Sequence, residues 1–211
     1  MRTGLKTLLW LAVMVAFTAC KEGENIPIAD SAFHDGDIIF QESQSAQSQA
    51  IQLATGSKYS HCGIIYENNG DYFVYEAIQP VQTTPLQEWI DRGKGGHYVV
   101  KRLKNADSLL TDKVLQKMEQ AGKHFNGKDY DLYFEWSNDR IYCSELVWKI
   151  YEKGAGIELS TPEKLRDFDL SNPAVKQKLT ERYGKKIPMD ETVVSPAAIF
   201  DSELLYTVKA E

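Results

Sequence analysis

Three side chains with the chemistry of acyl transfer stand in two segments of this sequence. His61 and Glu76 lie near the two ends of KYSHCGIIYENNGDYFVYEAI (58–78), and Cys143 lies in DRIYCSELVWKIY (139–151). A thiolate can attack a carbonyl carbon, an imidazole can carry the proton, and a carboxylate can fix the tautomer of that imidazole. The three residues therefore predict nucleophilic catalysis on an amide or ester, provided that the fold brings them together.

The spacing of His61 and Glu76 fits a β-hairpin. Asn69-Gly70 is typical of a two-residue type I′ turn, which would pair Asn68 with Asp71. Because side chains alternate between the faces of a strand, this register puts Glu76 on the face of His61 and diagonal to it. A shift by one residue would move Glu76 to the opposite face, so the predicted contact depends on this turn.

Cys143 is predicted to lie in the first turn of a helix. Apolar residues at helical spacing begin just after it, namely Leu146, Val147, Ile150 and Tyr151. The unpaired amides and the dipole at a helix N-terminus stabilise a thiolate, and a nearby imidazolium lowers the thiol pKa further. The backbone N–H of Cys143 is also a candidate donor to an oxyanion.

Structural roles compete with this interpretation. A histidine on a half-buried strand is commonly just packed, and Cys143 could be a small buried hydrophobe. A Cys62–Cys143 disulfide is not expected, because Cys62 should point away from the face of His61, so that a cysteine reaching His61 should not reach Cys62. No metal or other cofactor is expected either, because the candidate ligands lack the spacing of a structural zinc site; they are His61, Cys62, His97, His124 and Cys143.

The remaining segments supply the elements that would position these residues. Strands are predicted at 38–40, on both sides of the Asn69-Gly70 turn and at 97–103. Helices are predicted around 43–56, at 84–93 with Pro85 in the first turn, within 108–131 with a stop at Asn126-Gly127, after Cys143, and at 171–184 and 195–202. This order predicts a mixed α+β domain.

The N-terminus has the pattern of a secretory signal. Residues 1–19 carry two basic residues and then an apolar run from Leu8 to Phe17, too short to span a bilayer. The ending FTAC resembles a bacterial lipobox, which implies lipidation of Cys20. We therefore expect a signal peptide at 1–19, a lipidated cysteine and polar tether at 20–32, and a catalytic domain at 33–211. The expected location is the bacterial cell envelope, lipid-anchored and facing the periplasm or exterior, on the outer membrane where one exists.

Charge and cysteine content exclude two classes of protein. The 211 residues carry a formal net charge of −6 and contain no basic run, which argues against a nucleic-acid partner. With Cys20 lipidated, only Cys62 and Cys143 remain, which is too few for a disulfide scaffold.

Several motifs together resemble the circularly permuted papain-like enzymes of the NlpC/P60 superfamily, in particular their YiiX-like group. They are GDIIFQ, SQSQAIQLATGSKYSHCGI, YEAI and YCSELVWKIY, and the likeness runs from about residue 35 to 201. The resemblance implies an antiparallel sheet or partial barrel packed against helices. It also implies Cys143 as nucleophile, His61 as base and Glu76 as the orienting acid, in the permuted order with histidine first. Cys62 and Asp129 depart from the expected pattern, which has a small or hydroxyl residue and a proline there.

The expected function is that of an exported, lipid-anchored thiol hydrolase or acyltransferase that forms a cysteine acyl-enzyme. The resemblance allows two substrates, a peptidoglycan peptide or a lipid-like acyl amide or ester. Aromatic residues near the motifs could line an apolar pocket or the core: Tyr59, Tyr133, Phe134, Trp136 and Tyr142. The alternative is a non-catalytic envelope lipoprotein that binds a lipid or peptide in a papain-like cleft.

Overall fold

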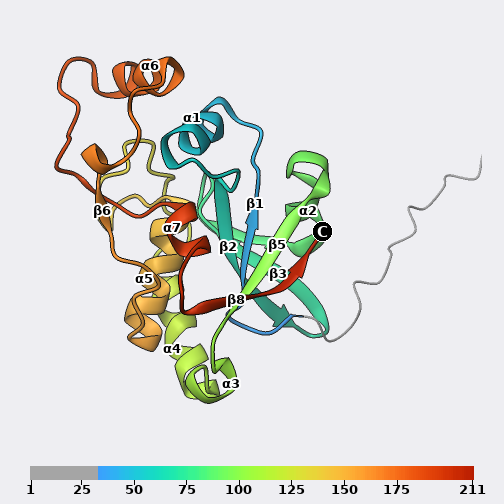
Figure 1. The fold of residues 1–211 in the computed structure, drawn as a ribbon. Coiled ribbons are helices and arrows are strands. Elements are labelled where there is room, and N and C mark those ends of the chain that lie inside the picture. The colour runs from blue at the N-terminus through green and yellow to red at the C-terminus, as the bar shows by residue number, and fades with distance from the viewer. Residues whose placement is uncertain (1–32) are drawn as a thin grey trace, which may run out of the picture. The chain divides into compact units, whose positions relative to one another are not determined.

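A six-stranded antiparallel sheet organises the part of the chain that the computed structural model describes, residues 33–211 (Figure 1). The strand order is β4-β3-β2-β1-β5-β8. The strands are β1 (Ile38–Gln41), β2 (His61–Asn68), β3 (Asp71–Glu76), β4 (Gln82–Pro85), β5 (Tyr98–Leu103) and β8 (Leu205–Ala210). β2 lies inside the sheet, between β1 and β3, so the segment that begins with His61 is held by ladders on both sides.

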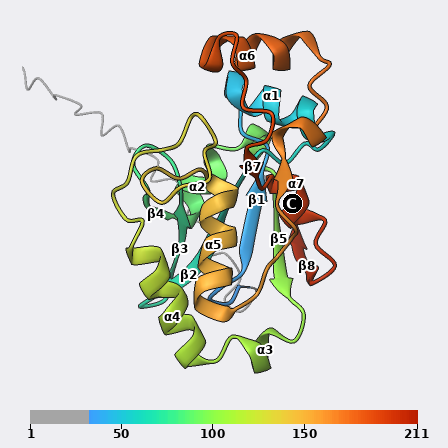
Figure 2. The ribbon, with the colours of Figure 1, turned by 90° about the vertical axis from the view of Figure 1, so that its left-hand side faces the viewer.

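Two helices, α4 (Asp112–Lys123) and α5 (Cys143–Ala155), cover one face of this sheet (Figure 2). They approach closely at Gly154, where an added Cβ would lie 2.5 Å from the Cα of Met118. Ile64 and Phe40 of the sheet and Leu146 of α5 belong to one buried cluster. The helix that carries Cys143 therefore forms part of the main core.

A second group of elements lies beyond the N-terminal end of α5. It comprises α1 (Ala46–Thr55), α6 (Pro173–Tyr183), α7 (Pro196–Phe200), the 3₁₀ turn η2 (Leu165–Asp167) and the ribbon of β6 (Glu163–Lys164) with β7 (Thr192–Val193). The amide of Asp169 donates to the carbonyl of Ala54 at 3.0 Å, and Arg182 Nη2 donates to Gln47 Oε1 at 2.8 Å. These bonds join α1 to the α6 region, although the two are far apart in sequence.

The remaining elements are short. α2 (Leu86–Asp91) and the 3₁₀ turn η1 (Lys94–Gly96) connect β4 to β5, and α3 (Ala106–Leu109) precedes α4. The face of the sheet away from α5 is also buried, because Ile39, Ile65 and Val74 have no exposed surface. No helix of residues 33–211 is long and apolar enough to cross a membrane.

The α+β class is confirmed, with an antiparallel sheet packed against helices. The helix predicted within 108–131 divides in two, because Thr111 adopts an extended conformation that separates α3 from α4, and α4 ends at Lys123, shortly before the predicted stop at Asn126-Gly127. Pro85 ends β4 and caps α2 instead of lying in its first turn. The predicted signal peptide, lipidated Cys20 and tether fall on residues 1–32, outside the described residues.

Candidate active site

The β2–β3 hairpin brings His61 and Glu76 together. Asn68 pairs with Asp71 as the turn predicts, and the register continues to Ile64 opposite Tyr75. Glu76 ends β3 without exposed surface, and its Oε2 lies 2.6 Å from Nε2 of His61. The predicted contact is therefore confirmed. Since Glu76 holds Nε2, Nδ1 is the nitrogen left for another partner.

Three further donors hold the Glu76 carboxylate. Trp89 Nε1 donates to Oε2 at 2.9 Å, Thr84 Oγ1 donates to Oε1 at 2.6 Å, and the guanidinium of Arg92 also donates to Oε1. Burial opposes ionisation of Glu76. The interaction with His61, the hydrogen bond from Thr84 and the charge of Arg92 outweigh burial and lower the pKa of Glu76. The Trp89 ring also stacks on His61, with centroids 5.8 Å apart. The imidazole is thus fixed on its edge and on its face.

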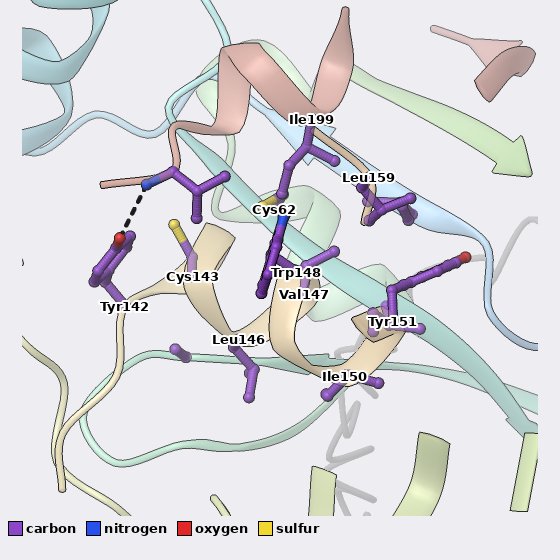
Figure 3. Close-up of a cluster of buried hydrophobic side chains, with 14 of the residues drawn as sticks. Cys62, Tyr142, Cys143, Leu146, Val147, Trp148, Ile150, Tyr151, Leu159 and Ile199 are labelled. Carbon is purple, nitrogen blue, oxygen red and sulfur yellow. Dashed lines mark hydrogen bonds between the residues drawn. The ribbon is translucent and has the colours of Figure 1, made fainter. Parts of the chain in front are cut away.

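Cys143 is the first residue of α5, as predicted. The residues on both sides of it are tied to Val194, because Ser144 Oγ donates to the Val194 carbonyl at 2.8 Å and the Val194 amide donates to Tyr142 Oη at 3.1 Å (Figure 3). An amide in the first turn of a helix has no partner within the helix. The backbone N–H of Cys143 is therefore positioned by a fixed helix start.

The charged forms of Cys143 and His61 stabilise each other. A hydrogen bond with the Cys62 thiol, followed by the interaction with His61, outweighs burial and holds the pKa of the Cys143 thiol well below its ordinary value. Burial would lower the pKa of His61, but hydrogen bonds with Cys143 and Glu76 raise it to about 9. The stable form near neutral pH is therefore a thiolate beside an imidazolium.

The expectation that Cys143 would not reach Cys62 is wrong. Alternation does put Cys62 on the face that α5 covers, where it belongs to the same buried cluster as Cys143. However, α5 begins near the first residues of β2. His61 and Cys62 therefore both interact with Cys143, although they lie on opposite faces of the strand. Each thiol shifts the pKa of the other, and both are free of disulfides.

Tyr130 is a neighbour of Cys143 that the sequence did not indicate. Its hydroxyl accepts a bond from Gln47 Nε2 at 3.0 Å and is hydrogen-bonded with Cys143. Burial, followed by the charge of Cys143, raises the pKa of Tyr130 well above its ordinary value. The hydroxyl therefore stays protonated and is a candidate donor to the reacting group.

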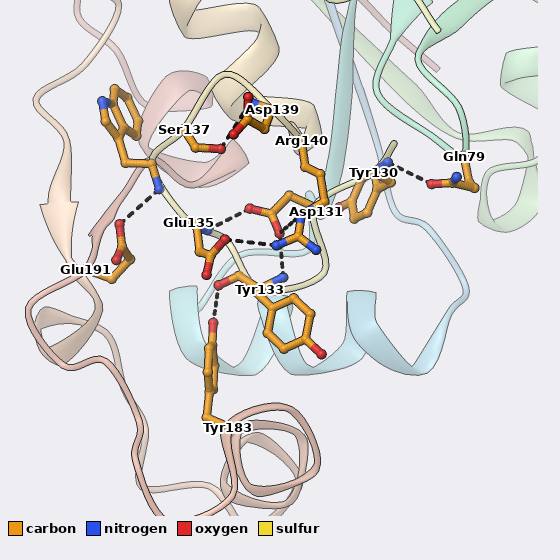
Figure 4. Close-up of polar contacts among 11 residues, drawn as sticks. Gln79, Tyr130, Asp131, Tyr133, Glu135, Ser137, Asp139, Arg140, Tyr183 and Glu191 are labelled. Carbon is orange, nitrogen blue, oxygen red and sulfur yellow. Dashed lines mark hydrogen bonds and ion pairs between the residues drawn. The ribbon is translucent and has the colours of Figure 1, made fainter. Parts of the chain in front are cut away.

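The loop after Tyr130 is held by the buried carboxylate of Asp131 (Figure 4). This carboxylate accepts bonds from the amides of Tyr133 and Glu135 at 2.8 and 2.7 Å. The amide of Asp131 donates to the carbonyl of Ile141, two residues before the cysteine. The loop and the start of α5 are therefore positioned together.

An apolar cavity of about 80 Å³ opens beside Cys143. It is enclosed by α1, α6, η2 and β7, and its apolar lining consists of Ala50, Ile51, Ala54, Phe134, Leu165, Phe168, Leu170, Val175, Leu179, Val193 and Val194. Lys178 and Arg182 of α6 complete one side. Of the aromatic residues singled out in the sequence, Phe134 and Tyr142 line this cavity.

A larger groove, of about 640 Å³, opens beside His61, and its lining mixes polar and apolar groups. Its polar side chains carry mostly hydroxyl and amide groups: Gln41, Ser43, Ser45, Gln47, Ser48, Ser60, Gln79 and Tyr130, together with Arg92. Gln47 and Ile51 line both the groove and the apolar cavity. The Cys143–His61 pair therefore lies between an apolar cavity and a larger groove of mixed lining.

Residues 32–209 match the family described as permuted papain-like amidase enzymes, YaeF/YiiX, C92. The chain belongs to this family. The match spans the whole described domain, and papain-like amidases are hydrolases. The wider NlpC/P60 assignment, the catalytic roles of the three residues and the substrate stay predictions.

Two relatives from Escherichia coli agree with this assignment. The protein YiiX of strain K12 is 51% identical over 176 residues, which is 83% of this chain and 86% of YiiX. A crystal structure described as metalloprotein yiiX, from strain O157:H7, is 52% identical and superposes with a TM-score of 0.80 over 84% of this chain and 97% of the other. Both cover most of the domain.

Proposed function

We propose that this protein is a thiol hydrolase or acyltransferase that cleaves an amide or ester through an acyl-enzyme on Cys143. One observation carries the proposal: the thiolate lies between an apolar cavity and a groove that offers hydroxyl and amide side chains, with His61 on the groove side. A bond between an apolar acyl group and a polar leaving group fits across this junction.

Acylation begins from the ion pair. The Cys143 thiolate forms a bond to the carbonyl carbon, and the carbonyl oxygen becomes an oxyanion. The backbone N–H of Cys143 and the Tyr130 hydroxyl are the donors proposed to stabilise this charge. His61 then gives its proton to the leaving nitrogen or oxygen as the bond to the acyl carbon breaks.

Deacylation reverses these roles. His61, now neutral, takes a proton from water or from an acceptor amine or alcohol, which attacks the thioester carbon. The Cys143 thiolate leaves and the imidazolium is restored. Throughout both steps Glu76 holds Nε2 of His61, so that Nδ1 faces the sulfur and the reacting group.

The lining of the cavity favours a lipid-like acyl group over a cell-wall peptide. Burying the unpaired amide and hydroxyl groups of a muropeptide among the apolar side chains would cost roughly 2–7 kcal/mol for each group. The cavity, of about 80 Å³, has room for a short acyl chain.

The groove supports a polar leaving group. Its hydroxyl and amide side chains can pair with hydroxyl, amide or amine groups, and among its lining residues Arg92 is the charged side chain besides His61. An amine or alcohol with several hydrogen-bonding groups is the chemistry that this groove matches.

No step above uses a metal ion. One relative is described as a metalloprotein, but among residues 33–211 of this chain no three His, Cys, Asp or Glu side chains are grouped to hold one ion. The described residues therefore do not fit a metal centre.

The proposal includes export and a lipid anchor at Cys20, with the enzyme in the cell envelope and facing the periplasm or exterior. The lipobox-like ending FTAC supports this. In a bacterium that processes lipoproteins, Cys20→Ser should lose the lipid mass and leave the membrane fraction. A variant that stays membrane-bound would contradict the anchor.

Intact-mass spectrometry tests the reaction directly. Wild type and Cys143→Ala are exposed to acyl amides and esters of about four to twelve carbons with polar leaving groups, and to muropeptides. We expect an adduct of the acyl mass on wild type alone, from medium-chain substrates. An adduct from muropeptides only would overturn the substrate assignment.

Two substitutions on one helix test the cavity. Ala54→Phe fills the space beside Cys143 and should shift the preference to shorter chains, while Leu53→Phe, at an exposed neighbour, should leave it unchanged. No adduct and no turnover with any substrate, together with tight binding of the same amides, would favour the alternative of a non-catalytic binding protein.

A further inference from the structure

We propose that Cys62 and Cys143 form a reversible disulfide when the protein meets a peroxide, and that this bond protects the nucleophile from irreversible oxidation. The inference concerns a modification of the thiols and goes beyond the hydrolytic reaction. It begins from the contact that strand alternation did not predict.

The backbone aims both the thiol and the amide of Cys62 at Cys143. In the β1–β2 ladder the amide of Ile65 donates to the carbonyl of Asp37, so by alternation the amide of Cys62 faces away from β1. β3 would supply the partner on that side, but it ends at Glu76. The amide of Cys62, which has no ladder partner on that side, stabilises the Cys143 thiolate and contributes to lowering the pKa of that thiol.

Both side chains lie in the buried cluster near the first turn of α5 (Figure 3). Cys62 has no exposed surface, and the Cys143 thiol contributes to raising the pKa of the Cys62 thiol. Because both side chains belong to one cluster, no backbone segment has to cross the core for the two sulfurs to bond. A third cysteine, Cys20, lies in a different part of the sequence.

The two thiols differ in reactivity, which sets the order of events. Cys143 is the thiolate and lines the cavity that opens beside it, so a molecule as small as hydrogen peroxide can reach it. Burial raises the pKa of the Cys62 thiol, and this residue stays protonated. Cys143 is therefore oxidised first, and Cys62 follows as the resolving thiol.

The reaction balances in two steps. The Cys143 thiolate attacks one oxygen of hydrogen peroxide, giving a sulfenic acid and hydroxide, so the sulfur is oxidised and the peroxide reduced. The Cys62 sulfur then bonds to the Cys143 sulfur, and the hydroxyl group leaves as water with the Cys62 proton. A dithiol reductant restores both thiols by exchange and becomes a disulfide itself.

Peptide mass mapping of the full chain tests the proposal without any substrate. After graded peroxide, free thiols are blocked with iodoacetamide and the protein is digested with trypsin, which places Cys62 in residues 59–92, Cys143 in 141–149 and Cys20 in 7–21. We expect a cross-linked pair of the first two peptides, lighter than their sum by two hydrogens, which dithiothreitol separates.

Cys62→Ser is the matched variant. In it, peroxide should convert Cys143 to sulfinic and sulfonic acids, and dithiothreitol should not restore its alkylation, whereas wild type should recover. Wild-type Cys143 carrying sulfinic acid beside an alkylated Cys62 would overturn the proposal, as would a link to Cys20 or between two chains. The wild-type peptide map is sufficient to test the proposal, so the test does not depend on whether the variant folds. It also does not require that the protein turns over any substrate.

Discussion

Replacing Glu76 by glutamine would test how the site makes a thiolate. The carboxylate receives four donors, from His61, Trp89, Thr84 and Arg92, two on each oxygen. An amide has one oxygen and one NH₂ group, so one pair of donors would face another donor. The shape is kept, while the charge opposite His61 is lost.

The size of the effect follows from the proton balance. The proton that leaves Cys143 is held by His61, so free energy lost from the imidazolium makes ionisation of the thiol less favourable by the same amount. A hydrogen bond to a charged group contributes about 1.5–3 kcal/mol. At about 1.4 kcal/mol per pKa unit, Glu76→Gln should raise the apparent pKa of the Cys143 thiol by about one to two units.

Alkylation by iodoacetamide across pH measures this shift, with the modified peptide 141–149 counted by mass spectrometry. Glu119→Gln is the control, because it makes the same change on an exposed carboxylate of α4. Circular dichroism and thermal unfolding establish that both variants are folded. A folded Glu76→Gln protein with the alkylation midpoint of wild type would refute the proposed role of the carboxylate.

Three further outcomes are expected. Because the raised pKa of His61 is about 9, kcat/KM should fall as pH rises through that value and the imidazolium loses the proton that the leaving group needs; a constant rate to pH 10.5 would contradict this. Tyr130→Phe should lower kcat by roughly 10²–10³ if the hydroxyl stabilises the oxyanion, whereas Tyr133→Phe, on the half-exposed next turn, should be close to wild type in the same assay. Gly154→Ala should lower the free energy of unfolding by at least about 1–3 kcal/mol, because its Cβ meets the Met118 backbone; an unchanged urea midpoint would show that the helices separate freely.

The local parts of the site could be predicted from the sequence. The Asn69-Gly70 turn fixes the register, and the period of two in a strand does the rest, so the contact of His61 with Glu76 needs no information from distant segments. The start of α5 at Cys143 is likewise encoded by the apolar spacing just after it. Both features depend on stretches of 16 residues or fewer.

The parts that come from distant segments could not be predicted. Thr84 and Arg92 are ordinary residues of a strand and a helix end, and only the folded sheet brings them to Glu76. Tyr130 depends on a loop whose position is set by Asp131 and the chain before Cys143. For Cys62, alternation was right about the face, but it cannot show that a helix begins above the end of the strand.

Two helices that line the apolar cavity, α5 and α6, differ in how deeply they are built into the fold. α5 is buried along most of its length, so its amides should exchange hydrogen only through global unfolding. α6 buries only Val175 and Leu179 among its residues and should exchange by local opening at a much lower free energy. Substitutions in α6 can therefore alter which acyl chains are accepted while the thiolate and imidazolium remain as they are. Relatives that share the same reaction can thus differ in the chain length that they prefer.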